Sequence, residues 1–327
     1  MLIWLVLIPL IAAALIGLCK APARPTALLS ASLTLALGIW ALVSFDGCSS
    51  CWSRFEGMDL QLTLAPALSK VMLLLTILVT FATVLGTNPP QGGEASWYNS
   101  ALLISAGATG AFLSDNIISF FAFHELALIP TFVMIGLYGR GDRRTTAWRA
   151  TLYLGLASMV LLAALLMIGT QAGFTFSGLK DFMASGRELA HAELIGALLI
   201  AGFGTLISLF PFHSWAAPAY ASAPAPVAMM HAGVLKKFGL YGLFMFQPLM
   251  ETGFLPWTNI LLVLLVCNVI WVGYVTVNQK RLDLLLGNSS VMHMGYIFLA
   301  FAALVVSGSA EANPWALKGA ALLMLAH

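Results

Sequence analysis

Residues 209–242 decide the fold: LFPFHSWAAPAYASAPAPVAMMHAGVLKKFGLYG is an apolar, helix-like run that prolines interrupt before it resumes. The prolines are Pro211, Pro218, Pro224 and Pro226. Inside a bilayer, non-helical backbone is tolerated only where it is buried in protein or lines a watered cavity. The pattern therefore predicts a broken membrane helix, a feature often found at transport sites.

The composition of the whole chain agrees with a membrane protein. Hydrophobic residues make up 60% of the 327 residues and charged residues 9%, and the mean hydropathy is +0.94. These values predict an all-α integral membrane protein, a bundle of helices in the lipid bilayer. The net charge of the chain is only +2 and its basic residues are scattered along the sequence, so no nucleic-acid partner is predicted. The 4 cysteines are too dispersed for a structural zinc site or an iron–sulfur cluster, and no metal or cofactor is predicted.

Apolar runs of about 20 residues, the length needed to cross the hydrocarbon core, follow one another along the chain. They predict about 10–11 transmembrane helices. The runs lie near 2–18, 27–45, 62–86, 97–114, 116–138, 148–170, 193–215 (continuing irregularly to 226), 227–249, 257–277 and 283–307, and a last one starts at Pro314. That last run is roughly 21 Å long at a 1.5 Å rise, short of a core of roughly 30 Å. We expect either more chain after His327 or a partner that covers this end.

Two domains are predicted, with N-terminal helices in 1–96 and a helical core in 97–327. Lys and Arg favour the loops on one side of the membrane, which places the N-terminus in the periplasm of a bacterial inner membrane. Cys48 and Cys51 then lie in an outside loop, where they either form a small disulfide or stay as free thiols. Residues 171–192 predict a short amphipathic helix on the outer surface.

Glu125 is the clearest intramembrane charge. It lies nine residues after Asn116, or about 14 Å along a helix, close to the middle of a core of roughly 30 Å. A charged side chain there costs about 2.5–3.5 kcal/mol on insertion scales. Such a residue is either a proton carrier in transport or a protonated carboxyl that hydrogen-bonds a neighbouring helix.

Two consecutive lysines follow the break. A buried lysine is moved between its charged and neutral forms by what lies beside it, as a proton relay requires. Lys236 and Lys237 point about 100° apart on a helix, so at most one of them faces a given partner. We assign the relay role to Lys237 and expect Lys236 to pair locally or to extend toward the membrane surface.

Histidines make a polar axis plausible, because imidazole passes protons near neutral pH. Those in or at the ends of predicted spans are His124, His213, His231, His293 and His327. Each is alternatively a hydrogen-bonded packing residue. Two cations are candidate partners for Glu125, and His124 is a weaker candidate than Lys237, because adjacent helix residues do not face each other.

Four stretches occur in the order of one known family: FFAFHELALIPTFVMIGLYG (120–139), FPFHSW and GVLKKFGLYG (within 210–242), QKRLDLLLGNSSVMHMGY (279–296) and WALKGAALLMLAH (315–327). They resemble the antiporter-like subunits of the proton-pumping NADH:quinone oxidoreductase (respiratory complex I), closest to its chain M. The D-type subunits of multisubunit cation/proton antiporters and subunits of membrane-bound hydrogenases are similar. The resemblance implies about fourteen helices with two inverted five-helix repeats, so about three helices would follow His327.

The resemblance also implies roles for individual residues. Glu125 matches the midplane glutamate of the family, Lys237 matches a lysine after the break, and His293 and His327 match polar positions on the central axis. With His213 and His231 they form the predicted proton-translocation site. Two departures stand beside these matches: Leu206 occupies the place of a lysine that partners the glutamate, and the family's W-L-P-D-A-H is Trp215 to Tyr220 here, without the Asp and the second His.

The leading hypothesis is a membrane-arm subunit of NADH:quinone oxidoreductase that translocates protons, with other membrane-arm subunits as partners. No NADH, flavin or iron–sulfur motif occurs, so quinone chemistry would reach this chain only through the whole complex. One alternative is a D-type antiporter subunit or a hydrogenase subunit. Another is a non-pumping scaffold paralogue, which Leu206 favours.

Overall fold

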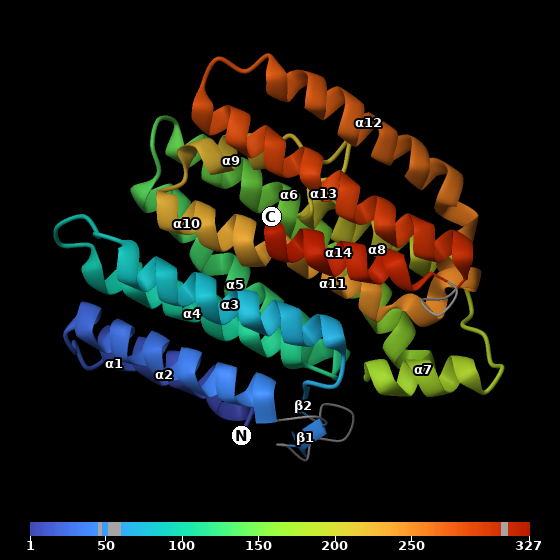
Figure 1. Ribbon diagram of the computed structural model, residues 1–327, viewed down its shortest axis with the longest axis horizontal. Helices are drawn as coiled ribbons and strands as arrows, with labels where there is room; N and C mark the ends of the chain where they lie inside the picture. Colours follow the sequence, from blue (N-terminus) through green and yellow to red (C-terminus); the bar gives the residue numbers. More distant parts are fainter. Residues whose placement is uncertain (45–47, 52–59, 309–312) are drawn as a thin grey trace. The chain divides into compact units, whose positions relative to one another are not determined.

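The computed structural model describes residues 1–44, 48–51, 60–308 and 313–327, and this part of the chain is almost entirely helical (Figure 1). Six of its helices are long and apolar enough to cross a membrane, and three shorter helices are also apolar. The predicted all-α membrane fold is confirmed. A small antiparallel sheet of β1 (Cys48–Cys51) and β2 (Gln61–Thr63) is an addition that the sequence did not predict. The side chains of Cys48 and Cys51, and so their pairing, lie outside the described residues.

The chain forms two compact units, the first made of 1–139 and 224–235 and the second of 140–223 and 236–327. The predicted division at residue 96 concerns function and stays a prediction. So do the inverted repeats that the resemblance implies.

The first unit contains α1 (Ile3–Gly17), α2 (Ala23–Ser44), α3 (Ala67–Gly86), α4 (Glu94–Leu113), α5 (Ile117–Tyr138), α10 (Ala225–Met230) and the π-helix η1 (His231–Leu235). Glycines bring α4 and α5 close together. A Cβ at Gly107 would lie 2.6 Å from Phe123 O, and one at Gly110 would lie 2.5 Å from the Phe123 ring. This contact holds the segment just before Glu125 against α4.

The start of α5 is set by its cap. Asn116 Oδ1 accepts hydrogen bonds from the backbone N–H groups of Ile118 and Ser119, each 2.9 Å long. Such a cap satisfies orphan donors of the first turn. Asp115 N donates to Gln61 O at 2.9 Å, which ties the same turn to β2. The cap fixes the position of α5, and with it the height of Glu125 along the helix.

The second unit contains α6 (Arg143–Ala172), α7 (Phe176–Ala184), α8 (Ala192–Leu206), α9 (Ala216–Ser222), α11 (Lys237–Met245), α12 (Thr258–Val277), α13 (Leu282–Ser307) and α14 (Pro314–Ala326), with the short helices η2 (Gln247–Leu249), η3 (Met250–Phe254) and η4 (Leu255–Trp257). Helix α13 lies between α12 on one side and α14 on the other (Figure 1). The predicted amphipathic helix is present as α7, which buries Phe176 and Leu179 and exposes Lys180 and Asp181.

The predicted break exists, but the helix ends earlier than the predicted residue 215. α8 stops at Leu206, and Ser208 then has a φ of 66°, in the left-handed region that ends a helix. Phe210 N donates to Asn268 Oδ1 at 3.0 Å, while Asn268 Nδ2 donates to Val291 O at 3.0 Å. One buried amide of α12 therefore holds the broken segment and α13 together, and the backbone N–H of Phe210 is satisfied within the protein.

Candidate functional site

The acidic part of the site lies in the middle of α5. Glu125 is confirmed as a mid-helix residue, and its side chain is 31% exposed, whereas that of His124 is fully buried. His124 Nδ1 lies 3.1 Å from Glu125 Oε1. The prediction that these neighbours do not face each other is therefore wrong, because both side chains are long enough to meet although adjacent positions diverge on a helix. This contact is a charge-assisted hydrogen bond when the pair is ionised.

His231 lies in the same unit as Glu125. It starts the π-helix η1, is 5% exposed, and belongs to a segment that packs against α3 and α5. A Cβ at Gly233 would lie 3.1 Å from Val79 Cγ2, so a glycine allows η1 to approach α3 closely. π-Helical turns are rare and frequently mark functional sites. The structure thus places His231 in an irregular, buried segment.

The basic part of the site lies in the second unit. Lys237, at the start of α11, is fully buried, and its Nζ lies 3.1 Å from Nδ1 of His327 at the end of α14. The two residues are 90 positions apart in the chain. An amine and an imidazole at this distance share one hydrogen, so either nitrogen can hold the proton.

His293 extends this contact. The rings of His293 and His327 have centroids 5.9 Å apart. His293 Nδ1 lies 2.7 Å from Ser289 O, and since a carbonyl only accepts, Nδ1 carries the hydrogen and Nε2 is left as an acceptor. His293 is exposed in the described chain. Lys237, His327 and His293 therefore form a line from the bundle interior to its surface.

Lys236 is not where the sequence placed it. It is 1% exposed, as buried as Lys237, so the expectation of a local pair or a surface-directed chain is wrong. Its Nζ donates to Ser290 Oγ at 3.4 Å and lies 4.8 Å from the centroid of the Tyr220 ring. The partners come from α13 and α9, so only the tertiary structure could reveal them. One of these partners, Tyr220, had already stood out in the sequence, because it occupies the place of the family's second histidine.

His213 lies in the broken segment between α8 and α9. It is half-buried, and its ring stacks on Phe210 with centroids 5.3 Å apart. The neighbouring Ser214 Oγ donates to Tyr153 Oη at 2.9 Å, which fixes this segment to α6. Of the charged groups near His213, Lys236 is the one whose electrostatic field acts on it.

Leu206, which replaces the expected lysine, is a packing residue. It is 3% exposed, and a Cβ at Gly239 would lie 3.5 Å from Leu206 Cβ. The end of α8 thus lies directly against α11, two residues after Lys237.

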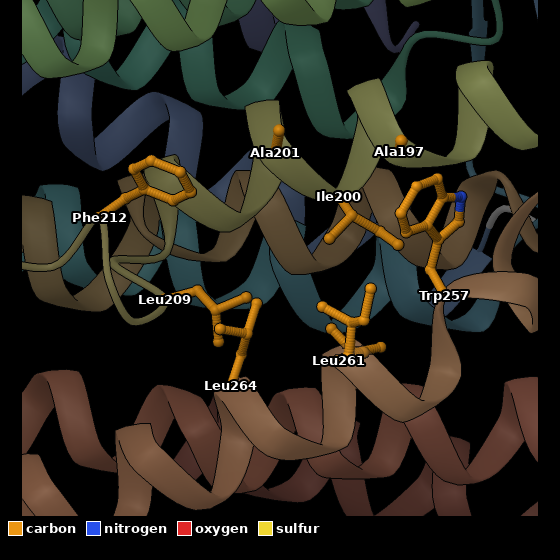
Figure 2. Close-up of a pocket in the computed structure, with 9 residues that line it drawn as sticks. Ala197, Ile200, Ala201, Leu209, Phe212, Trp257, Leu261 and Leu264 are labelled. Carbon is orange, nitrogen blue, oxygen red and sulfur yellow. The ribbon is translucent and has the colours of Figure 1, made fainter.

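The pocket in Figure 2 is a different kind of feature. Apolar side chains of α8, α12 and the broken segment line it, among them Ile200, Phe212 and Leu261. None of the lining side chains titrates. The pocket therefore contains none of the ionisable residues of the candidate site.

The helical fold with its candidate membrane spans and its broken segment is that of a multi-pass membrane protein of the antiporter-like type, with Glu125 inside one of those spans. A family model described as NADH:quinone oxidoreductase/Mrp antiporter, transmembrane, matches residues 114–327. The chain belongs to this family.

Relatives and solved structures agree with that assignment. The chain is 32% identical over 267 residues to NAD(P)H-quinone oxidoreductase chain 4 2 of Microcystis aeruginosa, covering 80% of this chain and 46% of the relative. For chain 4 1 of Picosynechococcus sp. the identity is 30%, covering 84% and 50%. The chain thus spans about half the length of the curated relatives it matches.

Among the structural matches that cover 99% of this chain are two from respiratory assemblies and antiporters. One is in respiratory complex I from Thermus thermophilus with bound NADH (25% identity, TM-score 0.82, 70% of that chain). The other is in the Mrp complex from Dietzia sp. DQ12-45-1b (20% identity, TM-score 0.85, 36% of that chain), a likeness of fold.

Proposed function

We propose that this chain is a membrane-arm subunit of an NADH:quinone oxidoreductase and translocates protons across a bacterial inner membrane, with its N-terminus in the periplasm. The observation that carries the proposal is the fully buried Lys237 amine, 3.1 Å from the His327 imidazole. Burial disfavours the charged form of an amine, so a change in the charges around it can switch it between its protonated and neutral forms. Its imidazole neighbour can take or supply the proton.

The work of the chain in this proposal is electrostatic. Glu125 and His124 on α5 hold a proton in one unit, and Lys237, His327 and His293 hold and pass one in the other. His213 and His231 are the proposed contributions of the broken segment and of η1. Quinone reduction takes place in other subunits of the complex, which are the partners of this chain, and its energy arrives as shifts of charge.

Two alternatives rest on specific observations. The fold likeness to the Mrp complex and to a sulfane sulfur reductase complex favours a related ion-translocating assembly, either a cation/proton antiporter or a hydrogenase-like complex. Leu206, a packing residue in place of the expected lysine, favours a non-pumping scaffold. The two alternatives differ in what they predict: an antiporter exchanges ions without NADH oxidation, and a scaffold moves no protons itself.

Membrane vesicles from the native host test the proposal. NADH oxidation by the complex should acidify the vesicle lumen, and Lys237→Met should reduce the number of protons moved per NADH while the complex remains assembled. Lys318→Met is the matched control, since Lys318 is exposed and lies near the start of α14. Unchanged proton movement with Lys237→Met favours the scaffold, and ion exchange without NADH favours the antiporter.

A further inference from the structure

The two lysines at the start of α11 are separate sites. Lys236 has helical dihedrals (φ −58°, ψ −29°), so its side chain leaves the helix about 100° around from that of Lys237. Lys237 reaches His327 on one side. Lys236 reaches Ser290 and Tyr220 on the other. Two buried amines thus occupy consecutive positions and have no partner in common among these contacts.

The described groups around Lys236 stabilise its protonated amine but carry no negative charge that would neutralise it. Its Nζ donates to Ser290 Oγ at 3.4 Å and lies 4.8 Å from the Tyr220 ring centroid. The ring face attracts an ammonium group. Within the residues that the structure describes, no carboxylate is in ion-pair distance of Lys236. A positive charge here is supported by dipoles and a ring alone, so it is easily displaced.

A hydrogen-bonded path leads away from this amine. The hydroxyl groups of Tyr220 and Ser290 are hydrogen-bonded to each other, and Ser290 Oγ also contacts Lys236 Nζ. A hydroxyl both donates and accepts, so it can take a proton on its oxygen as it gives up its own. Among the described residues, titratable groups that act on Lys236 include Tyr220 on α9, His213 in the broken segment and the neighbouring Lys237.

The two amines repel each other when both are charged. Lys237 acts electrostatically on Lys236, and in a low-dielectric interior like charges on consecutive residues disfavour double protonation. A proton on one of them therefore tends to expel the proton from the other. Such a pair titrates as a unit.

We propose that Lys236 is a second proton-holding residue, loaded through Ser290 and Tyr220, and that its charge expels the proton of Lys237 toward His327. This inference rests on the proposed function. In the loading step, Ser290 Oγ gives its hydrogen to the neutral Nζ of Lys236 and takes one from the Tyr220 hydroxyl, which water on the side of the broken segment reloads. In the release step, the proton on Lys237 Nζ moves to Nδ1 of His327, and Lys237 is left neutral.

Proton movement per NADH in vesicles from the native host tests the proposal. Lys236→Met should lower it about tenfold or more, in line with the loss of a proton-transfer group, while the assembled complex keeps its amount. Lys236→Arg should be as deficient, because a guanidinium stays protonated and cannot cycle. Lys236→His should retain measurable transport, because imidazole does cycle. A purely structural charge would give the opposite order, with Arg better than His.

Two further variants keep the test decisive if changes at Lys236 prevent assembly. Tyr220→Phe keeps the ring under the amine and removes the hydroxyl, and Ser290→Ala removes the hydroxyl link. Both should lower proton movement several-fold. Full transport with both variants, or with Lys236→Met in a complex that Lys237→Met inactivates, overturns this inference alone. Full transport with Lys237→Met and with Glu125→Gln overturns the proposed function as well.

Discussion

The acidic site on α5 and the basic site on α11 are built in different ways. Glu125 takes its contact from the adjacent residue of its own helix, His124, at 3.1 Å. Lys237 takes its contact from His327, 90 positions away, and Lys236 from Ser290, 54 positions away. The carboxylate is 31% exposed and both lysines are almost completely buried.

The difference shows how much each site depends on packing. The contact between His124 and Glu125 involves side chains of α5 alone, so it needs no element of the second unit. The lysine contacts need α9, α11, α13 and α14 in their places. The α5 site should therefore tolerate packing defects in the second unit, and the α11 site should not.

The largest effect is expected at the acid itself. Under the proposed function, Glu125→Gln removes a proton-holding carboxyl with little change in shape, and the rate of proton movement should fall about a hundredfold or more. The amount of assembled complex should stay the same. Fluorescence quenching of a pH-sensitive dye in vesicles measures the first quantity, and native gels measure the second.

Glu94→Gln is the matched control, because Glu94 lies exposed in the first turn of α4 of the same unit. It should leave transport intact. A Glu125→Gln complex that pumps at the normal rate would remove α5 from the proton path.

A packing defect next to the lysines should come second. A Cβ at Gly239 would lie 2.7 Å from Phe203 O and 2.6 Å from Ile207 Cγ2, so Gly239→Val overpacks the α8–α11 contact. Overpacking typically costs about 1–3 kcal/mol. We expect a lower Tm and reduced proton movement, both measured on the purified complex.

Gly155→Val is the control for this change, since a Cβ at Gly155 on α6 meets nothing within 4 Å. The comparison is sharpened if Gly239→Val impairs transport and Gly155→Val does not. Equal behaviour of the two variants would show that α11 adapts to the added volume.

The local contact on α5 should have a smaller effect. His124→Phe keeps a ring where His124 lies stacked against Phe120 (centroids 6.5 Å apart) and removes the nitrogen that reaches Glu125. A hydrogen bond to a charged group contributes about 1.5–3 kcal/mol. A loss of transport of about tenfold is expected, measured as protons moved per NADH. An effect as large as that of Glu125→Gln would give His124 a proton-carrying role of its own.

The smallest effect belongs to a pair that lies outside both sites. Arg281 Nη2 donates to Asp283 Oδ2 at 2.6 Å at the start of α13, and the side chains are 66% and 36% exposed. The hydrogen bond to Asp283 raises the pKa of Arg281, which is charged at every usable pH in any case. Solvent screens such exposed pairs, which contribute little to stability, so Asp283→Asn should leave transport unchanged and lower the Tm very little. A large drop in Tm would mean that this helix start matters more than its exposure indicates.

Much of the fold could be predicted from the sequence because a bilayer leaves few choices. An apolar run long enough to cross the hydrocarbon must form a helix, since no water is present to satisfy its backbone. The spans α2, α3, α5, α12 and α13, the break after α8 and the mid-helix position of Glu125 all follow from that requirement. The exact end of α8 did not, because it depends on the tertiary hydrogen bond from Phe210 to Asn268.

The sequence by itself thus determined the membrane fold, the break and the acid on α5, features set by hydrophobicity and by positions close in the chain. Tertiary structure alone decided the environment of the lysines. The sequence predicted a local pair or a surface-directed side chain for Lys236, and this expectation was wrong because its partners Tyr220 and Ser290 come from other helices. A side chain's burial depends on what packs beside it, and helix periodicity says which way the side chain points but not what it meets there.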